Sequence, residues 1–137
     1  MALSHLDAGV IIGFLDRGDA HHPAAHAALS HAQQRRDRLA MASTAFAECL
    51  VGPSRRGEAA VATVRDLFDR LPISIIPLQP DTAVVAAQLR ARHPALRLPD
   101  AIVMATAIVD GADELVTTDR RWPSAKALKL KATLRHL

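Results

Sequence analysis

Residues 97–108 read Arg97-Leu-Pro-Asp100-Ala-Ile-Val-Met-Ala-Thr-Ala-Ile108, an apolar stretch in which a carboxylate directly follows a proline. Proline suits the first turn of a helix, where its missing N–H would have had no partner. Because almost every later residue is apolar, the stretch predicts a helix that is buried on most sides and ends near Asp110-Gly111. Asp100 is either an acid that satisfies free N–H groups in the first turn, or a site carboxylate held by a core helix. Other acids in the same place would favour the second interpretation.

The composition predicts one compact domain over residues 1–137, because a chain of this length with 50% apolar residues can bury one core. With 3% aromatic residues and no tyrosine, the core is expected to be aliphatic and surfaces for base stacking sparse. The net charge of +3 permits a polyanionic partner without requiring one. The single cysteine, Cys49, cannot form an internal disulfide. We expect neither a leader sequence nor a membrane span, and a cytoplasmic location.

The order of apolar and polar segments predicts an α/β fold with a mostly parallel sheet of four to five short strands and right-handed crossovers. Strands are expected at residues 3–7, 39–42, 72–77 and 114–118, with a lysine-bearing edge strand at 128–134. Helices are expected from residue 8 and at about 23–37, 45–51, 58–71, 81–92 and 99–110. Ser43-Thr44 offers a cap for the third helix, which Gly52-Pro53 is expected to end.

Two acids follow predicted strands at the same relative position. Asp7 ends the first strand and Asp119 lies just beyond the strand at 114–118. The carboxyl ends of parallel strands share one edge, where ligands bind, and the helices that follow strands begin there. Asp100 and Glu48 can therefore approach the same edge. Taken singly, Asp7 is also a helix N-cap candidate, and Glu48 can equally face water.

Four carboxylates in one pocket would repel one another and raise their pKa values unless a cation neutralised them. All four offer hard oxygen donors, which favours Mg²⁺ or Mn²⁺ over Zn²⁺. The sequence also contains histidines, but they lack the cysteine or the closely spaced acid of a zinc site, and we expect them on the surface; these are His21, His22, His26 and His31.

Four segments, in this order, resemble those of the PIN-domain ribonucleases, above all the VapC-type toxins of toxin–antitoxin pairs. They are Leu6-Asp7-Ala-Gly-Val, Ala47-Glu48-Cys-Leu-Val-Gly-Pro53, Leu98-Pro-Asp100-Ala-Ile-Val-Met-Ala-Thr106 and Val116-Thr-Thr-Asp119-Arg. The resemblance implies a three-layer sandwich around the sheet and a metal-dependent endoribonuclease. It also implies an RNA substrate, a small antitoxin whose C-terminal segment covers the acidic pocket, and a homodimer, which is common in the family.

The resemblance also implies roles for single residues. Asp7, Glu48, Asp100 and Asp119 match the catalytic acids. Of these, Asp7, Asp100 and Asp119 are expected to hold Mg²⁺ or Mn²⁺, and Glu48 to act as a ligand or to orient the attacking water. Thr117 and Ser43 match supporting hydroxyl residues. Thr118 stands where the family often has asparagine, and Arg121-Trp122 replaces an acidic-Phe pair; both departures are expected to alter local RNA contacts only.

Arginines near the acids are candidates for phosphate contacts, although each has a plain surface role as its alternative; they are Arg97, Arg120, Arg121 and Arg55. Two other functions compete. An aspartyl-phosphate phosphatase also has an acid after its first strand, but it needs a second aspartate where this chain has Gly9. A non-catalytic RNA- or protein-binding module gains nothing from four acids, because they weaken the binding of a polyanion.

Overall fold

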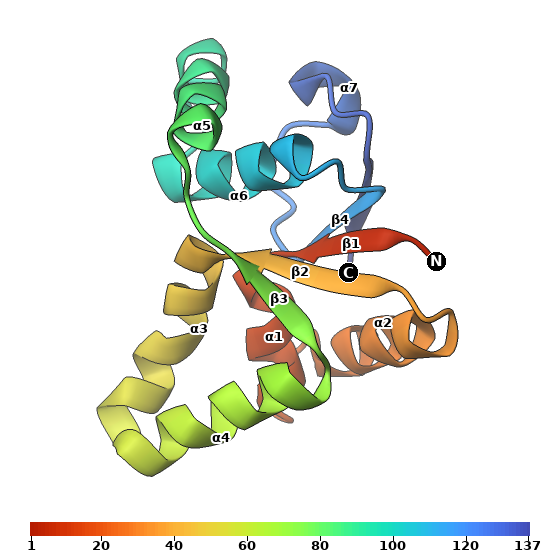
Figure 1. Ribbon diagram of the computed structural model, residues 1–137, viewed down its shortest axis with the longest axis vertical. Helices are drawn as coiled ribbons and strands as arrows, with labels where there is room; N and C mark the ends of the chain where they lie inside the picture. Colours follow the sequence, from red (N-terminus) through yellow and green to blue (C-terminus); the bar gives the residue numbers. More distant parts are fainter.

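The computed structural model describes residues 1–137 and places a five-stranded sheet at the centre of the molecule, with all strands parallel (Figure 1). The strands are β1 (Leu3–Leu6), β2 (Arg38–Ala42), β3 (Ile73–Ile76), β4 (Glu114–Thr117) and β5 (Thr133–His136), in the order β3-β2-β1-β4-β5. All four residues of the central strand β1 are buried, as expected for a parallel sheet covered on both faces. The predicted α/β class is confirmed.

Helices form a layer on each face of the sheet (Figure 1). One layer contains α1 (Ala8–Leu15), α2 (His22–Gln34), α3 (Ser43–Arg56) and α4 (Glu58–Arg70); the other contains α5 (Pro80–Arg92) and α6 (Leu98–Val109), with the short α7 (Ala125–Leu128) on the same side. The core between the layers is largely aliphatic, with Phe68 and Trp122 as its buried aromatic residues. None of the helices combines the length and the apolar character needed to cross a bilayer.

The helix predicted from residues 97–108 is α6, which packs against α5 and reaches β2 and α3. Seven of its twelve residues are buried, Asp100 among them. Pro99 is the second residue of the helix and Asp100 the third, so the start signal is confirmed. The N-cap is Arg97, and no side chain caps the helix.

The third helix differs from its prediction at both ends. Gly52-Pro53 does not end it, because α3 continues through both residues to Arg56. Pro53 has no N–H to donate within the helix, and its ring is buried. At the other end Ala42 is the N-cap and Ser43 the first helical residue, so the predicted Ser43-Thr44 cap is wrong.

The predicted final edge strand is present, but its bounds differ from 128–134, because β5 begins only at Thr133 and ends at His136. The preceding residues form α7, whose first turn is capped by Ser124 Oγ accepting a hydrogen bond from Ala127 N at 3.1 Å. Lys129 then leaves this helix in the left-handed region, with φ +54°. The alternating lysines therefore lie in the connection to β5 and not on the strand.

Candidate active site

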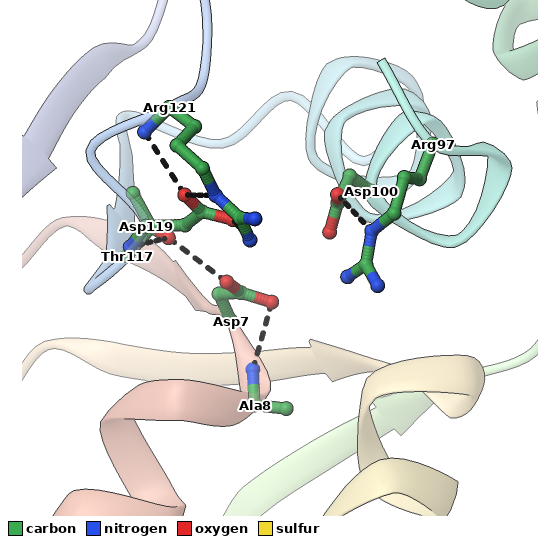
Figure 2. A network of polar contacts seen from close by, with 7 residues as sticks. All are labelled: Asp7, Ala8, Arg97, Asp100, Thr117, Asp119 and Arg121. Carbon is green, nitrogen blue, oxygen red and sulfur yellow. Dashed lines mark hydrogen bonds and ion pairs between the residues drawn. The ribbon is translucent and has the colours of Figure 1, made fainter. Parts of the chain in front are cut away.

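Asp7 lies at the carboxyl end of the central strand and begins α1 as its N-cap. One carboxylate oxygen accepts a hydrogen bond from Ala8 N at 2.9 Å and the other from Thr117 Oγ1 at 2.8 Å (Figure 2). This second contact follows from the sheet register, because β1 and β4 are neighbours and Leu6 is paired with Val116. Asp7 thus combines the two roles that the sequence left open: it caps a helix and points into a site.

Thr117 connects Asp7 to Asp119 (Figure 2). Its buried hydroxyl donates to Asp7 and accepts a hydrogen bond from Asp119 N at 3.0 Å. The Asp119 carboxylate in turn binds Arg121 through Nε at 3.1 Å, Nη2 at 3.0 Å and the backbone N at 2.9 Å. These hydrogen bonds hold the pKa of Asp119 below its usual range.

Asp100 approaches the same space from the other side, at the start of α6 (Figure 2). Its side chain is only 12% exposed and accepts a hydrogen bond from Arg97 Nε at 3.2 Å. Figure 2 shows the carboxylates of Asp7, Asp100 and Asp119 directed toward a common space, with the guanidinium groups of Arg97 and Arg121 beside them.

The electrostatics show that Asp7, Asp100 and Glu48 act on one another. Burial, with smaller contributions from the charges of Asp100 and Glu48, raises the pKa of Asp7 to about 6. The pKa of Glu48 is also raised, through partial burial and the charge of Asp100, with Arg97 opposing the rise. Glu48 lies on α3 and lines a separate hollow of about 480 Å³, together with Ile12 and Arg56 among others.

A second cleft, also of about 480 Å³, adjoins the carboxylates and is lined by both Asp100 and Asp119. Its remaining walls come from the loop that leads into α6 and from the residues that follow Asp119. They include four side chains that carry or can acquire positive charge, namely Arg92, His93, Arg97 and Arg121. No sequence pattern distinguishes Arg92 or His93 as a site residue, because only the folded chain brings the end of α5 next to the acids.

Three predicted site residues are not brought into this network. Ser43 starts α3 but makes no hydrogen bond to any of the four acids. Arg120 donates to the Leu137 carbonyl at 3.4 Å, and Arg55 is exposed near the end of α3. The histidines form local contacts instead of a metal site, for example His22 Nδ1 with the Gly13 carbonyl at 3.0 Å.

The donor set fits a hard divalent cation in kind, because the converging acids offer only oxygen atoms and the burial of Asp7 disfavours an uncompensated charge. The side chains are farther apart than the ligands of a bound metal ion, since no three acidic, histidine or cysteine side chains are grouped closely enough to hold one ion. Asp100 and Asp119 are instead engaged by Arg97 and Arg121.

Comparison with known proteins gives a consistent family and fold. A family model described as PIN domain matches residues 5–128. The structure resembles VapBC2 from Rickettsia felis, solved bound to a promoter DNA fragment, with a TM-score of 0.76, 17% identity and coverage of 98% of each chain. It also resembles VapC20 from Mycobacterium tuberculosis, a sarcin-ricin loop cleaving toxin, with a TM-score of 0.68, 16% identity and coverage of 86% of this chain and 91% of that chain.

A toxin–antitoxin complex from Klebsiella pneumoniae is similar as well, with a TM-score of 0.60, 23% identity and coverage of 86% of this chain and 88% of that chain. No curated protein matches the sequence significantly. At these identities the solved structures establish a shared fold.

Proposed function

Since this chain belongs to the PIN-domain family, we propose that it is a Mg²⁺- or Mn²⁺-dependent endoribonuclease and the toxin of a toxin–antitoxin pair. The observation that carries the proposal is the convergence of three carboxylates, from β1, α6 and the end of β4, on one space at the carboxyl edge of the sheet. The Mycobacterium tuberculosis neighbour, named as a sarcin-ricin loop cleaving toxin, supports this proposal.

In this mechanism Asp7, Asp100 and Asp119 hold the cation. When bound, the cation would lower the pKa of a water molecule and would stabilise the charge that develops on the phosphodiester during cleavage. Thr117 keeps the Asp7 carboxylate in place, because its hydroxyl is itself fixed by the backbone of Asp119. Glu48, whose pKa is raised by partial burial and by the charge of Asp100, is assigned the role of a ligand or of a residue that orients the attacking water.

Two exposed apolar surfaces support the proposed protein partners. Ile12, Leu15 and Val51 are 39–51% exposed and lie on α1 and α3, the helices that form the hollow around Glu48. We assign this surface to a segment of the antitoxin, because a chain bound there would cover Glu48. A second set, Val84, Leu98, Ile108 and Val109, lies on α5 and α6 and is assigned to the homodimer.

The proposed activity is tested by incubating the purified protein with single-stranded and hairpin RNA in Mg²⁺, in Mn²⁺ and in EDTA. We expect cleavage at internal positions with either ion and none in EDTA. Equal cleavage in EDTA would contradict the metal-dependent mechanism. RNA binding without any cleavage in either metal would indicate the non-catalytic binding module.

A further inference from the structure

The cleft beside the acids has the charge and position of a phosphate-binding site. Its lining includes Arg92, His93, Arg97 and Arg121, and its volume is about 480 Å³. Asp100 and Asp119 also line the cleft, so a ligand in it lies beside their carboxylates. A polyanion cannot approach those acids unless positive side chains offset their charge, and this cleft is where such side chains gather.

The two ion pairs in the wall are asymmetric. The carboxylates of Asp100 and Asp119 are 12% and 18% exposed, whereas the side chains of Arg97 and Arg121 are 64% and 81% exposed. Such exposed guanidinium groups gain little from an ion pair, because solvent screens the attraction. They are therefore free to turn to a phosphate, while the carboxylates are held at the buried end of the cleft.

We propose that this cleft binds a phosphodiester of the RNA strand next to the bond that is cut, and that binding there transfers Arg97 and Arg121 from the carboxylates to the phosphate. The transfer releases Asp100 and Asp119 for the cation. RNA and the metal ion then bind cooperatively: bound RNA raises the affinity for the metal ion, and the bound metal ion raises the affinity for RNA by the same factor. The inference rests on the proposed function and adds the substrate site and its coupling to the metal.

The cleft is tested first by RNA binding in EDTA, where no cation supports cleavage. The fluorescence anisotropy of a labelled short single-stranded RNA is measured over a range of salt concentrations for the wild type and for Arg92→Ala, Arg97→Ala and Arg121→Ala. Each substitution is expected to weaken binding and to reduce the slope of log K against log salt by about 0.7, the value for one contact to a single-stranded phosphate. Arg90→Ala removes an exposed arginine of α5 that does not line the cleft, and it should leave the slope unchanged.

The transfer of arginines is tested by Mn²⁺ binding without RNA, measured from the electron paramagnetic resonance signal of the free ion. Arg97→Ala and Arg121→Ala are expected to bind Mn²⁺ about three- to fivefold more tightly than the wild type, because their carboxylates lose a competing partner. Arg92→Ala is the matched control. It removes the same charge from the same cleft, but Arg92 has no carboxylate partner, so it should change the affinity less than twofold.

Unchanged RNA binding in Arg92→Ala, or no measurable RNA binding by the wild type, would overturn the cleft assignment. Equal gains in Mn²⁺ affinity for Arg92→Ala and Arg97→Ala would overturn the transfer, because charge alone would then explain them. Cleavage by the wild type is followed in parallel. If RNA binds through these arginines but the wild type does not cleave it, the proposed function is contradicted and the cleft assignment is supported. If the wild type cleaves RNA but Arg92→Ala binds RNA as the wild type does, only the cleft assignment is contradicted.

Discussion

Replacing Asp7 with asparagine is expected to abolish RNA cleavage and to stabilise the protein at neutral pH. Cleavage should fall by more than about a hundredfold, because replacing even a residue that only hydrogen-bonds to a metal ligand reduces activity by up to about a hundredfold. The gain in stability arises because burial raises the pKa of Asp7 to about 6, so holding this group ionised at pH 7.5 costs free energy that a neutral amide does not.

The pH dependence follows from the sign of that shift. Between the ordinary pKa of 3.8 and about 6, the native protein binds a proton at Asp7 that the unfolded chain has already lost. Stability is therefore lost as the pH rises through this range, and the penalty is complete above pH 6. This penalty is about 3 kcal/mol at pH 7.5, and asparagine recovers only part of it, because its amide nitrogen cannot accept the hydrogen bond from Thr117.

We expect the midpoint of thermal unfolding of Asp7→Asn to exceed that of the wild type by about 4 °C at pH 7.5, and the difference to vanish near pH 4. Thermal unfolding followed by circular dichroism measures both. Asp81→Asn is the control, because it changes an exposed acid in the first turn of α5 and should show no such pH-dependent gain. A variant less stable than the wild type at every pH would show that Asp7 stabilises the fold.

Gly9→Ala is expected to damage the site through Thr118. A Cβ at Gly9 would overlap Thr118 Oγ1 and would lie only 3.3 Å from Thr118 Cβ, so the Thr118 side chain cannot keep its position. Thr118 stands between Thr117 and Asp119, and any shift of it displaces the hydrogen bonds that connect Asp7 to Asp119. We expect a loss of about 1–3 kcal/mol in the free energy of unfolding and at least a tenfold loss of cleavage.

A second substitution tests this explanation. In Gly9→Ala/Thr118→Ala the hydroxyl and methyl groups are removed, and the nearest remaining side-chain atom is Cβ at 3.3 Å. Cleavage should return to within about threefold of Thr118→Ala alone, if the clash is the cause. Gly52→Ala is the control for a glycine within a helix, because its new Cβ would meet nothing closer than Arg56 Nη1 at 3.9 Å. No recovery in the double variant would refute the role of Gly9.

The sequence predicted the convergence of acids because a general rule of parallel sheets governs it. Asp7 and Asp119 follow strands, and strands β1 and β4 are neighbours that end at one edge. Asp100 could be placed with them because Pro99 marks the start of a helix whose residues are buried. These inferences need only the element order and the helix start signals.

The arginine pairs and the cleft could not be predicted in the same way. Arg97 and Arg121 are close to acids in the sequence, but so are Arg55 and Arg120, which the fold directs elsewhere. Arg92 reaches the cleft only because α5 ends beside the loop that leads into α6. The contact between Gly9 and Thr118 likewise depends on a close tertiary approach that leaves no periodic signal in the sequence.

The most direct test of the account compares Asp100→Asn with Asp81→Asn. Both acids lie in the first turn of a helix directly after a proline, and only Asp100 faces Asp7. Cleavage of RNA in Mn²⁺ and Mn²⁺ binding by the free protein are measured for both variants. We predict that Asp100→Asn loses cleavage by more than about a hundredfold and binds Mn²⁺ more weakly, while Asp81→Asn retains both. Equal behaviour of the two variants would mean that Asp100 serves its helix and not a metal-dependent active site.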